Sequence, residues 1–161
     1  MIKKLLTIKN KRKINLQTNN IKTKFMKPFH IKLLKLGAIQ TVLIAFYHFF
    51  IPFQFNWGDF LSEGTPTINW SLYALNNYFS FNLLIVAIFL LYHIFIKKEH
   101  IQTIKVLSII ATLFWCFSAI YQFIEPMPLP LSLSWLGYVL PGLALINIGI
   151  FSVPLKELIK I

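Results

Sequence analysis

The chain has 161 residues, of which 57% are hydrophobic, 16% aromatic and only 13% charged. This composition excludes an ordinary soluble domain, in which about a quarter of the residues are charged, and places the chain among membrane proteins. Sixteen basic residues stand against five acidic ones, and the formal net charge is +11 at pH 7. The only cysteine, Cys116, allows neither an intramolecular disulfide nor a cysteine metal cage.

Residues 1–30 precede the first apolar run and are predicted to form a basic, disordered tail on the cytoplasmic side. Eleven of the 16 basic residues lie in positions 1–35, where there is no acidic residue. The tail lacks the interleaved arginines and aromatic residues of a nucleic-acid arm, so we expect no nucleic-acid partner; contact with anionic lipid is the alternative to a solvated tail. Met26 is itself an acceptable start, and residues 1–25 are alternatively an extension ahead of it.

Four apolar runs follow, each near the roughly 20 residues that cross about 30 Å of hydrocarbon. They predict an all-α protein with a four-helix transmembrane bundle over residues 31–161. The first run is too far from the start, and is not followed by the small residues of a cleavage site, so we interpret it as a retained span. The predicted spans are residues 33–53, 70–96, 104–124 and 133–153.

Charge placement predicts the topology. Lysines occur in the N-terminal tail, in the connection after the second span and at the C-terminus, whereas the other two connections contain neither Lys nor Arg. By the positive-inside rule both termini are therefore expected in the cytoplasm. Lys outnumbers Arg fifteen to one, and Ile, Asn and Phe are frequent. This usage is typical of an AT-rich bacterial coding sequence, so we expect a multi-pass protein of the bacterial plasma membrane.

Two matching patterns suggest that the bundle consists of two repeated helical hairpins. The first and third spans end in "AFYHFFIP" (45–52) and "AIYQFIEP" (119–126), and the following spans open with "INWSLYAL" (68–75) and "LSWLGYVL" (133–140). Such a repeat would relate the halves by a twofold axis along the membrane normal. Aromatic belts and helix-ending prolines also occur without duplication. The pattern further predicts that Pro52 and Pro126 end equivalent helices at the outer surface.

Polar side chains are predicted to meet beneath the outer surface. Small residues mark the close-packed faces of membrane helices, and stripes of such residues in the first three spans each carry a polar side chain near that surface. At 1.5 Å per residue their depths coincide. Glu125 has no Lys or Arg on that side to pair with it. The candidate binding residues are His48, Asn76, Asn77, Ser80, Gln122 and Glu125, with Tyr47 and Tyr121 nearby.

The remaining sequence features favour no enzyme. The polar cluster offers one histidine and one nearby glutamate, too few for a zinc site, and neither a nucleophile elbow nor a phosphate-binding glycine loop occurs. No metal or other cofactor is expected. Pro141–Gly142 predicts a kink in the fourth span, for packing or to open a pocket.

These features predict an accessory or structural membrane protein. The alternative is an outward-facing site for a cation or proton, a quinone or a lipid headgroup, built from His48, Asn76, Gln122 and Glu125. Besides the lipid bilayer itself, the expected partners are another membrane protein, to which Glu125 would pair, or further copies of this chain.

Overall fold

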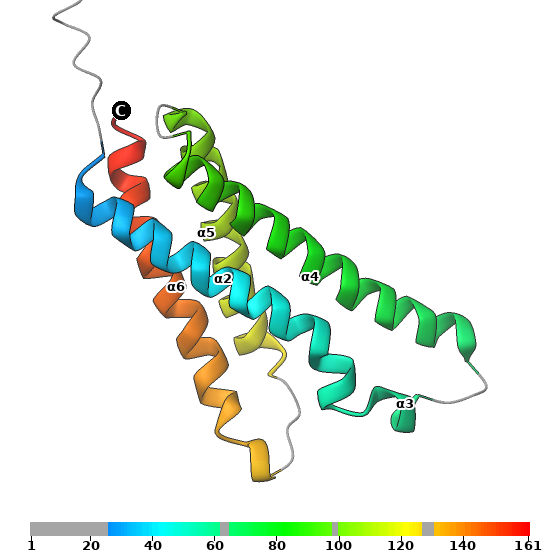
Figure 1. Cartoon of the computed structure of the whole chain (residues 1–161). Coiled ribbons are helices and arrows are strands. Elements are labelled where there is room, and N and C mark those ends of the chain that lie inside the picture. The colour runs from blue at the N-terminus through cyan, green and yellow to red at the C-terminus, as the bar shows by residue number, and fades with distance from the viewer. Residues whose placement is uncertain (1–25, 62–64, 98–99, 127–130) are drawn as a thin grey trace, which may run out of the picture.

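The computed structural model describes residues 26–61, 65–97, 100–126 and 131–161, and every regular element in these ranges is helical (Figure 1). The predicted tail over residues 1–25, and the question of where the chain starts, lie outside the described residues. The elements are α2 (Pro28–Gln54), α3 (Trp57–Phe60), α4 (Pro66–Phe95), α5 (Ile101–Ile124), a 3-10 turn (Leu131–Leu133) and α6 (Leu136–Leu158).

Four of the described helical segments are long and apolar enough to cross a membrane, which confirms the predicted number of spans. These segments are Pro28–Asp59, Pro66–Phe95, Ile101–Ile124 and Leu131–Leu158. The helices α2 and α4 begin before the predicted spans do, and both carry proline in the first turn. Proline fits there because the first N–H groups of a helix have no intrahelical partner and its φ is already helical. The helical domain therefore starts at Pro28.

The helices are arranged as two antiparallel pairs. Helix α2 packs along α4 to form a first hairpin, and α5 packs along α6 to form a second one. The hairpins join through smaller contacts of α2 with α6 and of α4 with α5. Figure 1 shows the hairpins close together where α2 begins and α6 ends, and diverging toward the opposite end.

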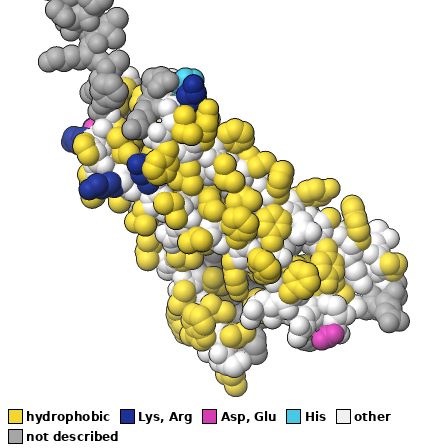
Figure 2. All heavy atoms as spheres, in the orientation of Figure 1, with side chains coloured by type: hydrophobic (Ala, Val, Ile, Leu, Met, Phe, Trp, Pro, Cys, Tyr) yellow, Lys and Arg dark blue, Asp and Glu magenta, His cyan; other side chains and the backbone are white. Residues whose placement is uncertain are grey.

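Basic side chains gather at one end of the bundle, which we call the basic end (Figure 2). At this end, Glu157 near the end of α6 pairs with Nδ1 of His30 and accepts a weak hydrogen bond from the backbone N–H of Lys27 over 3.4 Å. These contacts tie the last turn of α6 to the first turn of α2. The described lysines of this end are Lys27, Lys32, Lys35, Lys97, Lys105, Lys156 and Lys160.

Small residues fill the interfaces between helices, whereas most large apolar side chains point outward. Gly37, Thr41 and Ala45 on α2 are buried, as are Ser80 and Ala87 on α4. Ser108 and Ala119 are buried on α5. This confirms the predicted small-residue faces of the first three spans. Outward-facing Leu and Phe side chains suit a protein whose surface is solvated by lipid tails.

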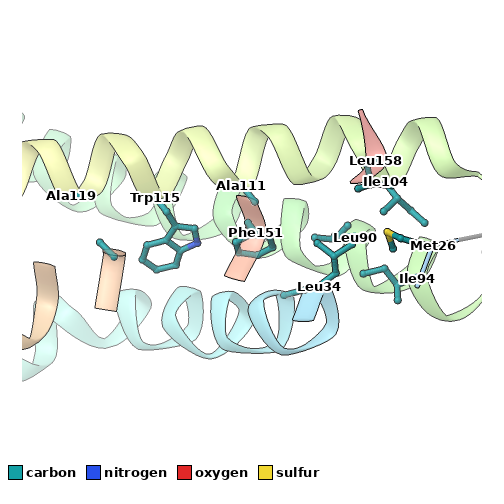
Figure 3. Packing of buried hydrophobic residues seen from close by; sticks show 12 residues of the cluster. Met26, Leu34, Leu90, Ile94, Ile104, Ala111, Trp115, Ala119, Phe151 and Leu158 are labelled. Atoms are coloured by element: carbon teal, nitrogen blue, oxygen red, sulfur yellow. The ribbon is translucent and has the colours of Figure 1, made fainter. Parts of the chain in front are cut away.

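One glycine permits a close approach between the hairpins. A Cβ atom added at Gly37 of α2 would lie 2.8 Å from Cγ2 of Ile150 and 2.8 Å from Cζ of Phe151, both on α6. Phe151 is 0% exposed and belongs to the buried apolar cluster with Leu34 and Leu90 (Figure 3). The helices α2 and α6 can therefore pack at this distance only without a side chain at position 37.

Interior hydroxyl groups are satisfied within their own helices. The hydroxyl of Thr41 donates to the carbonyl of Gly37 over 2.7 Å, and that of Ser108 donates to the carbonyl of Ile104 over 2.7 Å. Thr112 repeats the same contact with Ser108. This back-bonding to the carbonyl four residues earlier is common for Ser and Thr in membrane helices. These hydroxyls therefore add no directional bond between helices.

Candidate functional site

A polar contact joins α4 to α2 in the half of the bundle remote from the basic end. Nδ2 of Asn76 on α4 donates a hydrogen bond to the backbone carbonyl of His48 on α2, over 2.9 Å. In an uninterrupted helix this carbonyl would accept from the N–H four residues later. That residue is Pro52, which lies inside α2 and has no N–H. Asn76 thus supplies the hydrogen bond that the proline removes.

This contact accounts for a difference between the predicted and observed ends of the helices. The sequence predicts that Pro52 and Pro126 end equivalent helices, yet α2 passes through Pro52 and ends at Gln54. Helix α5 ends at Ile124, before Pro126. With its freed carbonyl satisfied from α4, α2 continues past its proline, so the two prolines have different roles.

The imidazole of His48 lies in a row of aromatic rings. Its centroid is 4.9 Å from that of Phe79 on α4, and Phe79 is in turn 5.4 Å from Phe114 on α5. The ring of Tyr47, whose side chain is exposed, contacts His48 edge-on at 6.5 Å. The row of rings therefore runs from α2 across α4 to α5 and connects the two hairpins.

The other predicted site residues divide between two helices. Ser80 is buried one turn after Asn76 and donates to its carbonyl over 2.6 Å, while Asn77 is exposed. Gln122 donates from Nε2 to the hydroxyl of Ser118 on its own helix over 3.0 Å. The structure thus joins His48, Asn76 and Ser80 through hydrogen bonds and, among the described contacts, gives Gln122 none to this group.

Glu125 lies at the exposed C-terminal end of α5. Its backbone N–H donates to the carbonyl of Tyr121 over 2.8 Å and closes the last turn. Tyr121 is exposed and stacks on Phe117, with ring centroids 6.0 Å apart. Gln122, one turn earlier than Glu125, has a buried side-chain oxygen Oε1 with no hydrogen-bond partner in the described structure. This end of α5 therefore presents an unpaired acceptor and a carboxylate.

The matching motifs of the two hairpins show similar exposure. Ala45 and Ala119 are both buried, and Tyr47 and Tyr121 are both exposed. Trp70 and Trp135, which open the second motif of each half, are exposed as well. These similarities fit two related hairpins, and the duplication itself stays a prediction.

The position of the predicted kink, Pro141 and Gly142, lies within α6, and the helix continues through both residues. A Cβ atom added at Gly142 would meet no atom within 4 Å. Gly142 therefore does not serve a close contact between helices, and the kink stays a prediction.

An apolar groove lies between the hairpins at the depth of the membrane. Its volume is about 280 Å³, and all four long helices contribute to it. Phe79 and Phe114, members of the aromatic row, form part of its walls, and the buried Phe151 of α6 lines it as well. The groove is at the lower limit of the roughly 300–1,000 Å³ of small-molecule pockets. It can therefore hold a single chain or ring.

Three side chains with polar atoms line this apolar groove, and the hydroxyl of one of them, Thr41, is already bonded within its own helix. Trp115 is only 4% exposed, and its indole N–H has no hydrogen-bond partner among the described residues. In Figure 3 the nitrogen edge of Trp115 is turned toward Phe151. Asn82, roughly midway along α4, is exposed and donates from Nδ2 to the carbonyl of Tyr78 over 2.8 Å. The groove thus combines a buried donor with an amide.

Asn82 and Trp115 are not among the residues predicted for a site, although each carries a signal in the sequence. Asn82 is a polar residue in the middle of a span, where such groups are costly and mark functional sites. Trp115 lies deep in its span, whereas membrane tryptophans are enriched at the interfaces. The volume of the groove depends on how the hairpins diverge, which residue spacing does not reveal.

The arrangement defines an all-helical protein with an apolar groove between two hairpins. Within the described residues, no group of three or more His, Cys, Asp or Glu side chains is placed to hold a metal ion. None of the family models, curated proteins and solved structures compared with this chain matches it.

Proposed function

We propose that this chain is a non-catalytic, accessory protein of the bacterial plasma membrane, with its basic end in the cytoplasm. The lysines of the basic end support this orientation, because positively charged residues are retained on the cytoplasmic side. The opposite end carries Asp59 and Glu125 in its described part. Polar groups inside the bundle, such as the amide of Asn76, take part in packing contacts.

We further propose that the groove binds a lipid-soluble molecule that carries a carbonyl oxygen. The observation that carries this proposal is the buried, unpartnered indole N–H of Trp115 in the groove wall. Indole N–H is a donor only, so its partner must be an acceptor. Buried tryptophan usually finds such a partner. Asn82 adds a side-chain oxygen and a second amide hydrogen for a polar group of the same molecule.

The position of the groove indicates that its ligand enters from the bilayer. The groove wall includes the exposed Phe117 and Asn82 on the two helices that face each other across the hairpins, α5 and α4. A ligand that leaves the lipid tails for this groove loses little of its apolar contact, because both surroundings are apolar. Selection then depends on the hydrogen-bonding groups, and a carbonyl compound is favoured over a plain hydrocarbon.

Two matched probes test this proposal. Decyl-benzoquinone and decylbenzene each carry a decyl chain on a six-membered carbon ring, and only the first has carbonyl oxygens. The affinity of each for the purified protein in nanodiscs is measured from the rise in melting temperature. We expect the quinone to bind the wild type more tightly, and Trp115→Phe to weaken its binding about fivefold, as befits one net hydrogen bond.

The matched control is Trp135→Phe, which removes an exposed indole from the start of the fourth span. It should leave both affinities unchanged. Equal stabilisation by the two probes, or an equal response of the two variants, would contradict the proposal. The N–H of Trp115 would then be satisfied by the face of Phe151, as weak N–H···π contacts allow.

A second candidate function concerns the remote end of α5. Here the unpaired Oε1 of Gln122 and the exposed Glu125 favour a cation or a donor-bearing ligand. His48 and Asn76 would complete this site if the hairpins closed upon it. Glu125→Gln should abolish cation-dependent stabilisation or pH-dependent growth if the site operates. An accessory role at this end predicts that affinity capture in mild detergent recovers a stoichiometric membrane protein partner, and repeated recovery of the chain alone would count against it.

A further inference from the structure

A second cavity, separate from the groove, lies at the basic end between the beginning of α2 and the end of α6. Its volume is about 260 Å³. The residues that line it are Lys27, His30, Val153, Lys156, Glu157 and Lys160. Three lysines and a histidine thus stand around a single carboxylate.

The single carboxylate is already engaged. Glu157 pairs with His30 and receives the backbone N–H of Lys27. The carboxylate is therefore held by groups at the start of α2. The side-chain charges of Lys27 and Lys156, which also line the cavity, exceed the single negative charge of Glu157, so the three together are net positive and suit an anion.

We propose that this cavity binds the phosphate of an anionic phospholipid headgroup. Basic pockets between transmembrane helices on the cytoplasmic side are suited to such headgroups, because the charge of the phosphate meets lysines at the membrane surface. The inference does not depend on the groove or its ligand, since the two cavities share no lining residue.

The surroundings of the cavity favour a lipid over a soluble anion. Val153, one turn before Glu157 on α6, lines the cavity and is exposed. Ile146, about two turns deeper along the same helix, is exposed as well. An acyl chain can therefore follow the surface of α6 while its phosphate remains among the lysines. A free phosphate ion would contact the lysines but would leave the apolar surface of α6 uncovered.

Native mass spectrometry of the full chain in mild detergent tests the inference. The protein is titrated with phosphatidylglycerol, which is anionic, and separately with phosphatidylcholine, which is zwitterionic, and the bound fractions give relative affinities. We expect the wild type to prefer phosphatidylglycerol. The double variant K27Q/K156Q should lose about 30-fold in that preference, since each lysine at the membrane surface contributes a substantial attraction to anionic lipid.

A double variant with the same change in charge provides the control. Lys32 and Lys105 lie at the basic end but do not line the cavity, and K32Q/K105Q should keep the preference nearly intact. The eight basic residues of positions 1–25 are present in both variants, so attraction by the tail cancels in the comparison. K27R/K156R, which keeps both charges, should retain the preference. The single variant K156Q should lose about fivefold.

Three outcomes would overturn the inference. An equal loss in K27Q/K156Q and K32Q/K105Q would assign the preference to general charge. Retention of the preference in both K27Q/K156Q and K156Q would show that the cavity does not bind the headgroup. Displacement of phosphatidylglycerol by inorganic phosphate at equal concentration would mean that a soluble anion is the ligand.

Discussion

The side-chain amide of Asn76 donates a hydrogen bond to the backbone carbonyl of His48 over 2.9 Å, in place of the backbone N–H that Pro52 lacks. In the first hairpin, α2 therefore lacks one backbone hydrogen bond, and a side chain of α4 replaces it. This relationship fixes how far α4 can slide or rotate along α2, since the donor must stay level with a single carbonyl. It also explains why an amide is placed at this position of α4.

Asn76→Ala should destabilise the bundle by about 0.6–1.7 kcal/mol, which are the average and the largest values for hydrogen bonds between membrane helices. The measurement is the free energy of unfolding in mixed detergent and dodecyl sulfate. Asn77→Ala, which changes the neighbouring exposed residue, should have little effect.

Pro52→Ala provides a second test of the same relationship. Alanine restores an N–H that can donate to the carbonyl of His48. Removal of the Asn76 amide should therefore cost less in the Pro52→Ala background than in the wild type. An equal cost in both backgrounds would show that the amide stabilises the hairpin in some other way.

Gly37→Ala should destabilise the contact between α2 and α6 by about 1–3 kcal/mol, because the new methyl group would overlap Ile150 and the fully buried Phe151. Gly149→Ala is the matched control on α6, where an added Cβ meets nothing within 4 Å. There the better helix propensity of alanine should leave stability unchanged or raise it by up to about 1 kcal/mol. Thermal unfolding in detergent measures both, and the same sign for the two variants would contradict the packing described.

Phe151 and Phe89 provide a test of which side of the helices faces lipid. Phe151→Ala should cost about 3–5 kcal/mol because it opens a cavity in the buried cluster. Phe89 is 53% exposed on α4, and Phe89→Ala should change stability by no more than about 0.5 kcal/mol. Comparable losses at the two positions would mean that the outward face of α4 is covered by protein.

The proposed orientation is tested by labelling single cysteines in the Cys116→Ser background. Asp59 lies in α3 at the end remote from the basic end, and Lys160 follows α6. A membrane-impermeant maleimide should label Asp59→Cys in intact spheroplasts and should label Lys160→Cys only after permeabilisation. The reverse labelling pattern would show that the orientation is the opposite of the one proposed. It would not bear on the packing of the bundle.

The spans and their packed faces could be predicted because they depend on apolar length and on small residues, which are local properties. Gly37, Ala45 and Ala119 illustrate this, since each is a small residue in an apolar run and each is buried. The true role of Pro52 was not predictable in the same way. A proline is read as the end of a helix unless a donor on another helix is known to reach the freed carbonyl.

The candidate site could be predicted in part. The depth of His48 and Asn76 followed from the rise per residue, and the two meet. Gln122, at a similar predicted depth, bonds instead to Ser118 one turn earlier. Spacing alone cannot distinguish a partner on the same helix from one across the bundle. The groove was missed because it depends on the angle between hairpins and on how Phe79 and Phe114 are turned.

The back-bonded hydroxyls of Thr41, Ser80 and Ser108 bear on how the chain is assembled. A segment that satisfies its own interior hydroxyls can leave the translocon as an independent rod, with no need of a neighbour to shield them from lipid. Association can then follow as a separate event, governed by the fit of shapes. The freed carbonyl of His48 on α2 is an exception, because its donor comes from α4. Helix α2 should therefore be less stable in the bilayer until α4 has been inserted beside it.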